Sequence, residues 1–310
     1  MILVSIIIPA YNAAQTIIAT INSALQQKSD WFTTEIIFVD DGSTDETPTI
    51  LKTYQQNYKI ITQVNSGASA ARQNGFEICK GDYIQYLDSD DLLFVGKIEL
   101  QLKALLTNDA DIAYGDFEKF SEKNNPNIVE ALVEGKIEGQ PDIAIFKSFW
   151  RPPAAILYSR RIVEKLFWST TLPVIQDARY LLDAVFIGGK LVYTPGVQAK
   201  YRINQTQSLS QRSNLAFVKD CFVNADEVYH IWKKDLKNQP EKKDALIEVL
   251  RNCITEFSIT DQQLFKQAIN LLLEISPKYI PQKSLSLRIL SLMFGYRNAE
   301  KMASLKRKLS

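Results

Sequence analysis

Three carboxylates lie within four residues in the stretch "YLDSDD", at Asp88, Asp90 and Asp91. They directly follow the apolar-rich run "YIQYL", so we expect them at the end of a buried strand. Carboxylates this close repel one another, and partial burial adds a further cost because it removes their hydration. Such a cluster is typical of a site that binds a hard divalent cation, or one that accepts hydrogen bonds from a ligand.

The D-x-D spacing of Asp88 and Asp90 suits a metal. Side chains two residues apart in extended or turning backbone point the same way, so these two carboxylates can share one ion or its water shell. Asp91 is expected to point elsewhere, toward a helix N-terminus. The alternative is a solvated acidic turn that caps the next helix, and a single D-x-D leaves both interpretations open.

A second acidic pair favours the ligand site. Asp40 and Asp41 end the apolar run "EIIFVDD". Ligands of open parallel α/β sheets bind outside the carboxyl ends of the strands, so both clusters are expected to face one crevice. Acids that only cap the following helices could explain one such cluster, but they explain a pair of clusters at successive strand ends less well.

The elements that carry these acids alternate along the first 118 residues. Apolar runs alternate with helical patterns. The apolar runs cover residues 3–8, 35–39, 59–64, 82–87 and 111–117, and the helical patterns cover residues 12–27, 43–54, 68–79 and 97–106. This alternation predicts an α/β fold with a mostly parallel sheet and helices on both faces. Capping boxes are predicted at Ser43 with Glu46 and at Thr260 with Gln263.

The rest of the chain predicts two further parts. Residues 121–140 form a polar excursion with a short hairpin, and "KLVYTPGVQAKYRI" predicts two short strands around a Pro-Gly turn. Apolar stripes at helical spacing dominate after residue 214. We therefore predict a catalytic domain over 1–213, with halves of about 1–118 and 119–213, and a helical region over 214–310.

Composition excludes several classes. The 310 residues carry a net charge of +1, which argues against a nucleic-acid partner, and three separated cysteines and one histidine argue against a disulfide framework or a Ser-His-Asp triad. The apolar N-terminus contains Pro9 and lacks a basic leader, so it predicts a strand rather than a signal peptide. No run is long enough to cross a bilayer, and the sequence predicts a cytoplasmic protein.

Five motifs together resemble the inverting glycosyltransferase family 2, which has the GT-A fold, a Rossmann-like fold of nucleotide-diphospho-sugar transferases. They are "SIIIPAYNA", "VDDGSTDET", "NSGASAARQNGF", "GDYIQYLDSDD" and the later "QD…GG…YR", in the family's order over about residues 3–210. The resemblance implies a nucleotide-diphosphate sugar as donor, most readily a UDP-sugar, and Mn²⁺ or Mg²⁺ as cofactor.

The resemblance also assigns roles to residues. It gives nucleotide and donor binding to Pro9, Ala10, Tyr11, Asp41, Gly67, Arg72, Asp88 and Ser89. Within this set Asp41 would accept a hydrogen bond from the base. Asp90 is the implied metal ligand, and the metal would stabilise the charge that grows on the leaving nucleoside diphosphate.

The acceptor side rests on fewer matches. Asp177 stands where the family has its catalytic base, with Gln176 in place of the family's Glu, and Asn204 replaces a histidine after Arg202. Trp150 and Arg151 lie where acceptors bind in the family. A carboxylate at the acceptor oxygen would take its proton in a single displacement with inversion.

Three functional hypotheses follow. The first is a metal-dependent glycosyltransferase that acts on a glycan or lipid-linked acceptor in surface polysaccharide or glycoconjugate synthesis. The second is a catalytically impaired nucleotide-sugar-binding module of the same fold, which the two departures keep open. The third, a nucleotide-dependent oxidoreductase, lacks the G-x-G-x-x-G sequence after its first strand.

The C-terminal tail admits two interpretations. Seven basic residues and one acid, Glu300, follow residue 282, among many apolar side chains; the basic ones are Lys283, Arg288, Arg297, Lys301, Lys306, Arg307 and Lys308. This pattern predicts one of two arrangements. Either the tail is a helix docked on the catalytic domain, or it touches an anionic membrane and the protein is peripheral at the inner face of that membrane.

Overall fold

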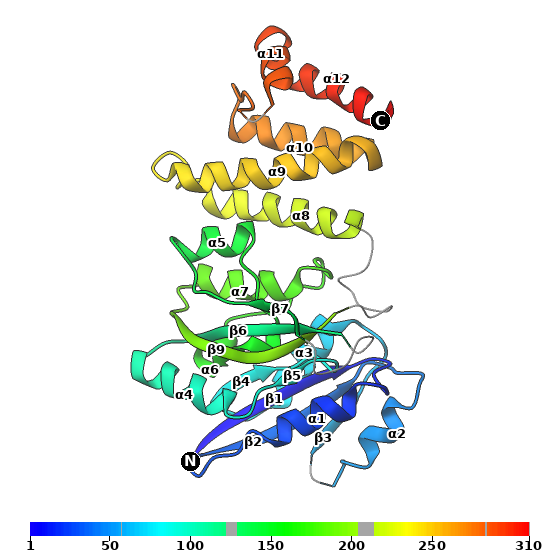
Figure 1. Ribbon diagram of the computed structural model, residues 1–310, viewed down its shortest axis with the longest axis vertical. Helices are drawn as coiled ribbons and strands as arrows, with labels where there is room; N and C mark the ends of the chain where they lie inside the picture. The colour runs from blue at the N-terminus through cyan, green and yellow to red at the C-terminus, as the bar shows by residue number, and fades with distance from the viewer. Residues whose placement is uncertain (57, 122–128, 204–213, 283, 310) are drawn as a thin grey trace. The chain divides into compact units, whose positions relative to one another are not determined.

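The computed structural model describes residues 1–56, 58–121, 129–203, 214–282 and 284–309, without the side chains of 308 and 309. It divides the chain into two compact units, Met1–Ser208 and Leu209–Ser310. Figure 1 labels the elements of both.

The first unit is a sheet with its helices. In chain order its elements are β1 (Ile2–Ala10), α1 (Ile17–Leu25), β2 (Phe32–Asp40), α2 (Thr47–Lys52), β3 (Lys59–Thr62), α3 (Ala68–Ile78), β4 (Tyr83–Tyr86), β5 (Leu92–Leu93), α4 (Lys97–Asn108), β6 (Ile112–Phe120), β7 (Val129–Val133), α5 (Pro141–Lys147), the 3₁₀ turn η1 (Pro153–Ala155), β8 (Ile156–Ser159), α6 (Arg160–Val163), α7 (Gln176–Phe186) and β9 (Leu191–Arg202).

The strand order is β3-β2-β1-β4-β8-β6-β9-β5, with β7 paired to β6. The four strands from β3 to β4 are parallel, as predicted. Beyond β4 the sheet is mixed, because β8 runs antiparallel to both β4 and β6 while β9 runs parallel to β6. The α/β fold class is confirmed, and the parallel part is confined to the half that carries both acidic clusters.

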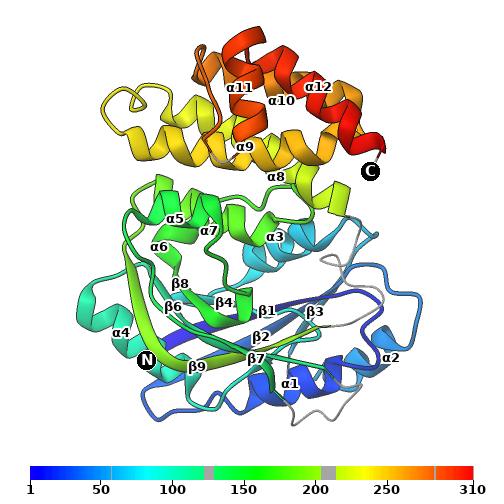
Figure 2. The same ribbon diagram turned by 45° about the horizontal axis from the view of Figure 1, so that its top comes forward.

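The two faces of the sheet are covered by different helices (Figure 2). Ile6 and Ile8 of β1 pack in one core with Ile17 of α1 and Ile98 of α4. Ile7, which points to the other face, lies against α3, where a Cβ on Gly75 would come within 2.4 Å of its side chain. This period-two alternation in a fully buried strand is why β1 is apolar at nearly every position.

Strand β9 corrects one prediction. The "YTPGVQ" stretch does not form a turn between two strands, because β9 continues through it beside β6. The register shifts between Gly115 and Phe117, where Pro195 and Gly196 form a bulge, and Gly196 adopts a φ of +91°. A bulge takes up the extra residues and the missing N–H of proline without ending the strand.

The predicted hairpin is present in part. Strand β7 pairs antiparallel with the end of β6, and residues 122–128 between them lie outside the described part.

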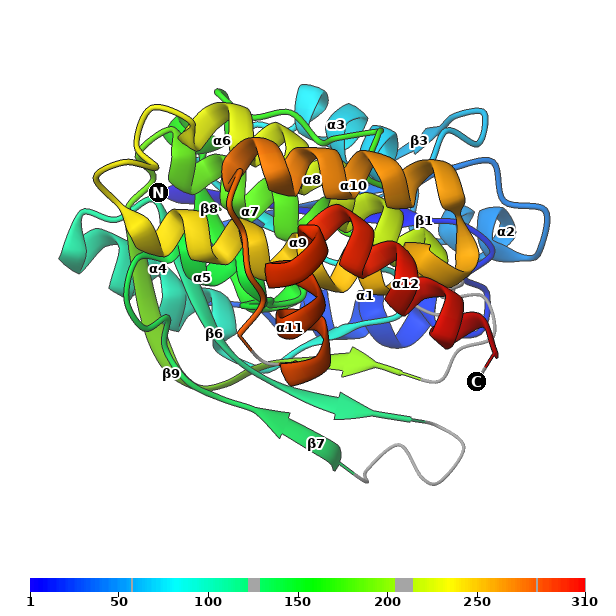
Figure 3. The ribbon, with the colours of Figure 1, turned by 90° about the horizontal axis from the view of Figure 1, so that it is seen from above.

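The second unit is helical, as expected, and Figure 3 shows its helices from above. They are α8 (Asn214–Trp232), α9 (Pro240–Thr260), α10 (Gln262–Ile275), α11 (Leu285–Phe294) and α12 (Tyr296–Leu309). In the described part of the chain, no helix combines the length and the apolar character needed to cross a membrane.

Neither predicted capping box forms. Thr260 is the last residue of α9, and Asp261 caps α10 by accepting from the backbone N–H groups of Gln263 and Leu264. In the first unit, α2 begins at Thr47, and the Ser43 hydroxyl instead accepts from the N–H of Asn12. At α10 the carboxylate of Asp261 takes the capping role in place of Thr260, and near α2 the Ser43 hydroxyl bonds to a residue that is distant in sequence.

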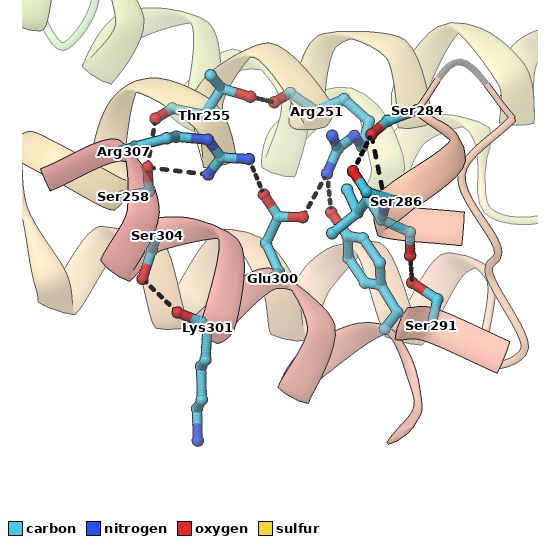
Figure 4. A network of polar contacts seen from close by, with 12 residues as sticks. Arg251, Thr255, Ser258, Ser284, Ser286, Ser291, Glu300, Lys301, Ser304 and Arg307 are labelled. Carbon is cyan, nitrogen blue, oxygen red and sulfur yellow. Dashed lines mark hydrogen bonds and ion pairs between the residues drawn. The ribbon is translucent and has the colours of Figure 1, made fainter. Parts of the chain in front are cut away.

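A buried ion-pair network holds α12 against α9 (Figure 4). The side chain of Glu300 is fully buried and accepts from Arg251 at 3.0 Å and Arg307 at 2.7 Å. Arg307 also donates to the hydroxyl of Ser258 at 3.0 Å. Within its own unit α12 is therefore a docked helix, and its partner is α9.

Candidate active site

Both acidic clusters lie at the carboxyl edge of the parallel strands. The N–H of Asp41 continues the β2 ladder by donating to the carbonyl of Ala10 at 2.8 Å, and the N–H of Leu87 donates to the carbonyl of Ile7 at 3.0 Å. Because β1 lies between β2 and β4, its end separates the two clusters by one strand. The expected convergence of the acids on one edge of the sheet is therefore present.

Asp41 organises the loop before α3. Its Oδ1 accepts from the N–H of Ser66 and the amide of Gln63, both at 2.7 Å, and its Oδ2 accepts from the N–H of Gly67 at 2.9 Å. Gly67 adopts a φ of +89°, which favours glycine although the space around it is open. Asp40 accepts from the N–H of Ser43 at 3.1 Å, so it is the member of the pair that serves the turn.

The end of β1 supports the same loops. Pro9 and Ala10 are buried, whereas Tyr11 is half exposed. Asn12, at a φ of +50°, accepts from the N–H of Thr44 at 2.8 Å. Tyr11 is thus the residue of the predicted trio whose side chain reaches solvent.

Asp88 is bound to a buried arginine. Arg72, on α3, is 4% exposed and forms an ion pair with Oδ1 of Asp88. Its guanidinium stacks over the ring of Trp168 at 4.5 Å, while Nε and Nη1 have no hydrogen-bond partner in the described part of the chain. The π face takes the place of acceptors for these N–H groups, and the arrangement fixes the direction in which Asp88 points.

Trp168 was not predicted as part of the site. It stacks on Tyr180 of α7 with ring centroids 4.0 Å apart, and Tyr86 meets both rings edge-on. This aromatic cluster lies under Arg72 and connects the end of β4 to α7. No spacing signal could reveal it, because Trp168 and Arg72 are 96 positions apart in the sequence.

Asp91 occupies a different place from the one expected. It is fully buried, and its Oδ1 accepts from the backbone N–H of Arg202 at 2.9 Å, at the end of β9, rather than from a helix N-terminus. The side chain of Arg202 donates to the carbonyl of Asp90 at 2.8 Å. Ser89 accepts through its carbonyl from the hydroxyl of Thr16 at 2.9 Å. These contacts fix the backbone of the whole acidic turn.

Two acids of this turn, Asp90 and Asp91, resist ionisation. Burial, with the charge of Asp88 added, raises the pKa of Asp90 to about 6. Burial and the neighbouring charges of Asp90 and Asp88 raise the pKa of Asp91 well above its ordinary value. Arg202 and Arg72 only partly oppose this effect at Asp90. The crowded turn thus disfavours the charged forms of these two acids, and a cation beside them would favour those forms.

Asp177 lies in the first turn of α7, near the same arginine. Its Oδ2 accepts from the indole N–H of Trp150 at 2.5 Å, and its Oδ1 accepts from the N–H of Ala178 at 2.9 Å. Burial raises the pKa of Asp177, while the Trp150 hydrogen bond and the charge of Arg72 lower it. A carboxylate held by two fixed donors and with a raised pKa is suited to accept a proton.

The remaining acceptor-side candidates are engaged within the protein. Gln176 is buried; its Oε1 accepts from the hydroxyl of Ser69 at 2.5 Å and its Nε2 donates to the carbonyl of Pro173 at 3.0 Å. Arg151 is buried and donates to the carbonyls of Gly115, Trp150 and Gly135. Both residues therefore hold loops in place, and Asn204 lies outside the described residues.

A metal would find two carboxylates here. Among the described residues, no group of three or more His, Cys, Asp and Glu side chains is arranged to hold an ion. Asp88 and Asp90 provide oxygen ligands of the kind that Mg²⁺ and Mn²⁺ prefer, and these ions usually take their other ligands from water and phosphate. The residues present therefore fit such a cation.

The fold has solved relatives that bind nucleotides. S. aureus TarS 1-349 in complex with UDP-GlcNAc aligns with a TM-score of 0.68 at 17% identity, over 99% of this chain and 92% of that one. The mannosyltransferase PcManGT from Pyrobaculum calidifontis, in complex with GDP-Man and Mn²⁺, aligns with a TM-score of 0.54 at 15% identity, over 99% and 86%. At these identities the likeness is one of fold, and it confirms the GT-A class.

Sequence comparison identifies the family. The family model described as glycosyl transferase family 2 matches residues 5–167, more than half of the chain. An Escherichia coli relative named UDP-Glc:alpha-D-GlcNAc-diphosphoundecaprenol beta-1,3-glucosyltransferase WfgD is 37% identical over 134 residues, 42% of this chain and 51% of the relative. The glycosyltransferase GlyA of Streptococcus pneumoniae serotype 4 is 28% identical over 217 residues, 65% of this chain and 31% of that protein.

The chain belongs to glycosyl transferase family 2. The resemblance found in its motifs is thereby confirmed, as is the enzyme class. The chain matches about half of the length of WfgD and less than a third of GlyA.

Proposed function

We propose that this chain is an inverting glycosyltransferase that moves a sugar from a UDP-sugar to an acceptor hydroxyl, in the synthesis of a surface polysaccharide or glycoconjugate. One observation carries the proposal. The guanidinium of Arg72 pairs with Asp88 on the donor side and lowers the pKa of Asp177 on the acceptor side. Donor and base candidates are therefore within electrostatic reach of one buried cation.

Asp41 supports uracil as the base. A carboxylate has about four acceptor positions, and the described protein groups fill three of those on Asp41. The remaining position on Oδ2 can accept from an imide N–H. Tyr11 follows β1 with its ring exposed and is the candidate to stack on the base, and the complexes of TarS with UDP and UDP-GlcNAc agree with this choice of donor.

Asp90 is the proposed direct metal ligand, and Asp88, oriented by Arg72, contacts the donor or the water of the ion. Bound Mn²⁺ or Mg²⁺ would supply positive charge against the diphosphate as it leaves. Among the described groups, Arg202 donates to the backbone carbonyl of Asp90 and to the side chain of Asp91, and so holds the ligand turn in place.

Asp177 is the proposed base. Its carboxylate accepts the proton of the acceptor hydroxyl while the acceptor oxygen bonds to the anomeric carbon. The bond from that carbon to the diphosphate oxygen breaks at the same time, and its electron pair leaves with the nucleoside diphosphate. A single displacement from the opposite face inverts the anomeric centre. Trp150 orients Asp177 through its N–H, and Gln176 and Arg151 support the loops around it.

The acceptor is proposed to be a glycan or a lipid-linked sugar. WfgD is named for a diphosphoundecaprenol-linked acceptor, and its matched segment shares 37% of its residues with this chain. The choice between a free glycan and a lipid-linked sugar is tested by offering both as acceptors with the same UDP-sugar.

The test of the proposed function compares two acids of the same helix. Asp177→Asn is expected to reduce transfer about 10²- to 10⁴-fold. Donor binding should remain, detected as a Mn²⁺-dependent rise in melting temperature with UDP-sugars. Asp183→Asn is the matched control, because Asp183 pairs with Arg179 at 2.7 Å on the same helix. It should keep wild-type transfer.

The competing hypothesis is the impaired nucleotide-sugar-binding module. It predicts the same thermal shift with UDP-sugars, but turnover that is absent or indifferent to both Asp177→Asn and removal of Mn²⁺. That result would refute the catalytic proposal while leaving the donor site intact.

A further inference from the structure

We infer that α11 and α12 form a docking surface for an anionic phospholipid membrane, on which both helices lie flat. The inference rests on the helical unit alone and stands apart from the donor site. We name the surface the α11–α12 face and define it by its exposed apolar residues: Leu285, Ile289, Leu292 and Met293 of α11, with Met302 and Leu305 of α12.

The apolar part of α11 is a stripe rather than a scatter. Leu285, Leu292 and Met293 are 73%, 64% and 67% exposed, and with Ile289 they recur at the spacing of one helical face. Phe294, the last residue of α11, is also exposed but lies outside this spacing. Leu287 and Ser291, on the opposite side of the helix, are buried. The helix thus uses its small side to pack on the protein and presents its larger apolar side outward, which is unusual for a water-facing surface.

Helix α12 repeats the arrangement. Met302 and Leu305 are exposed on one side, whereas Glu300 and Tyr296 are buried on the other. Lys301 and Lys306, both exposed, flank the apolar pair. Each helix is therefore amphipathic, with cations at the edges of its exposed apolar stripe, as in helices that lie in a membrane interface.

The exposed charge of this segment has one sign. Glu300 is the only acid after residue 282, and the network of Figure 4 buries it between Arg251 and Arg307. Among the described side chains, the exposed charged ones that remain on α11 and α12 are cations, namely Arg288, Arg297, Lys301 and Lys306. The network that docks α12 thus also removes the segment's negative charge from its surface.

This charge selects among occupants of the face. A second copy of the chain would bring Arg288, Lys301 and Lys306 against the same cations, which is unfavourable. An anionic lipid surface attracts each of them and accepts the apolar stripe at the boundary of its acyl chains. Helix α11 has ten residues, too few to cross a bilayer, so the structure assigns it to the membrane plane.

Co-sedimentation of the full-length chain with vesicles tests the inference. Vesicles of phosphatidylcholine with about one third phosphatidylglycerol should bind the protein at low salt, and pure phosphatidylcholine should bind it weakly. Leu292→Ser/Met293→Ser should weaken binding about tenfold or more, since the buried apolar area falls. Arg288→Glu/Lys301→Glu should weaken it at least about fivefold for each residue, and added salt should do the same.

The matched control substitutions are placed outside the α11–α12 face, on α8, on α9 and in the segment that follows α8. Ile231→Ser/Ile259→Ser removes two side chains of 48% and 51% exposure, and Lys234→Glu/Lys237→Glu reverses two exposed lysines. Both should bind vesicles as the wild type does. All these sites are exposed, so circular dichroism should report an unchanged fold.

Three results would overturn the inference. One is wild-type protein that stays in the supernatant with anionic vesicles at low salt. Another is binding that ignores lipid charge or the face substitutions. The last is light scattering that shows a dimer which Leu292→Ser/Met293→Ser converts to monomer, because the face would then join two copies. None of these results bears on Asp177 or the donor.

Discussion

The chain buries acidic side chains in two regions and treats them in opposite ways. In the helical unit, fully buried Glu300 has two guanidinium partners. At the edge of the sheet, Asp88, Asp90 and Asp91 crowd one turn, and burial beside Asp88 raises the pKa of Asp90 to about 6. Among the described residues, Oδ2 of Asp91 has no hydrogen-bond partner. Two internal cations pair with the structural acid, whereas at the edge the pKa of Asp90 and of Asp91 stays raised although Arg72 pairs with Asp88.

Removing an acid from the edge should abolish function and spare stability. Asp90→Asn is expected to lower transfer about 10³-fold, because the metal and the charge on the leaving group lose their ligand. The melting temperature without donor should not fall, since an acid whose ionisation is penalised by burial is replaced by a neutral amide of similar shape. Transfer assays with Mn²⁺ and thermal melts measure the two effects; a large loss of stability would contradict the contrast with Glu300.

Removing the acid of the helical unit should have the reverse effect. Glu300→Gln leaves Arg251 and Arg307 without their carboxylate, and we expect the free energy of unfolding to fall by about 2–3 kcal/mol. Urea unfolding followed by circular dichroism measures it, and transfer by the folded protein should stay unchanged. Glu274→Gln removes an exposed acid paired with Lys233 and should cost less than about 0.5 kcal/mol.

The indole that holds Asp177 should set the pH at which the enzyme works. Trp150→Phe removes an N–H that stabilises the ionised carboxylate, so the pKa of Asp177, already raised by burial, rises further. The base is then protonated over more of the acidic range, the acidic limb of kcat/KM moves to higher pH, and transfer at neutral pH falls about tenfold. Trp31→Phe, which breaks a bond to exposed Glu99, should leave the profile in place.

The smallest effect is expected at the loop of Asp41. Gly67→Ala and Gly96→Ala each force alanine into positive φ, at +89° and +78°, with open space at both sites. Each should cost about 1–2 kcal/mol of stability. Of these two glycines, only Gly67 donates its N–H to Asp41. Only Gly67→Ala should therefore raise the KM for the donor, by a few fold. Equal KM values in the two variants would argue against a nucleotide role for Asp41.

The sequence predicted well where the signal is periodic or local. Continuous apolar runs revealed β1 to β4, and the position of acids at strand ends placed Asp41 and Asp88 on one edge. The family motifs supplied Arg72 and Asp177 as candidates. All of these follow from burial and from the direction of parallel strands.

Prediction from the sequence failed where groups distant along the chain compete for a polar side chain. Asp91 binds an N–H of Arg202, 111 positions away, and Trp168 supports Arg72 from another loop. Neither partner leaves a trace in local spacing. The Pro195–Gly196 pair looked like a turn because a bulge and a turn share the same residues, and only the neighbouring strand decides between them.

The partners of Asp177 have a consequence for how it titrates. An indole N–H and a guanidinium both keep their protons across the whole range in which the fold persists. Neither can exchange a proton with that carboxyl, so the acidic limb of the proposed base should follow Asp177 together with the charge of Asp88, which raises its pKa. A histidine in either place would have tied two ionisations together and blurred that limb.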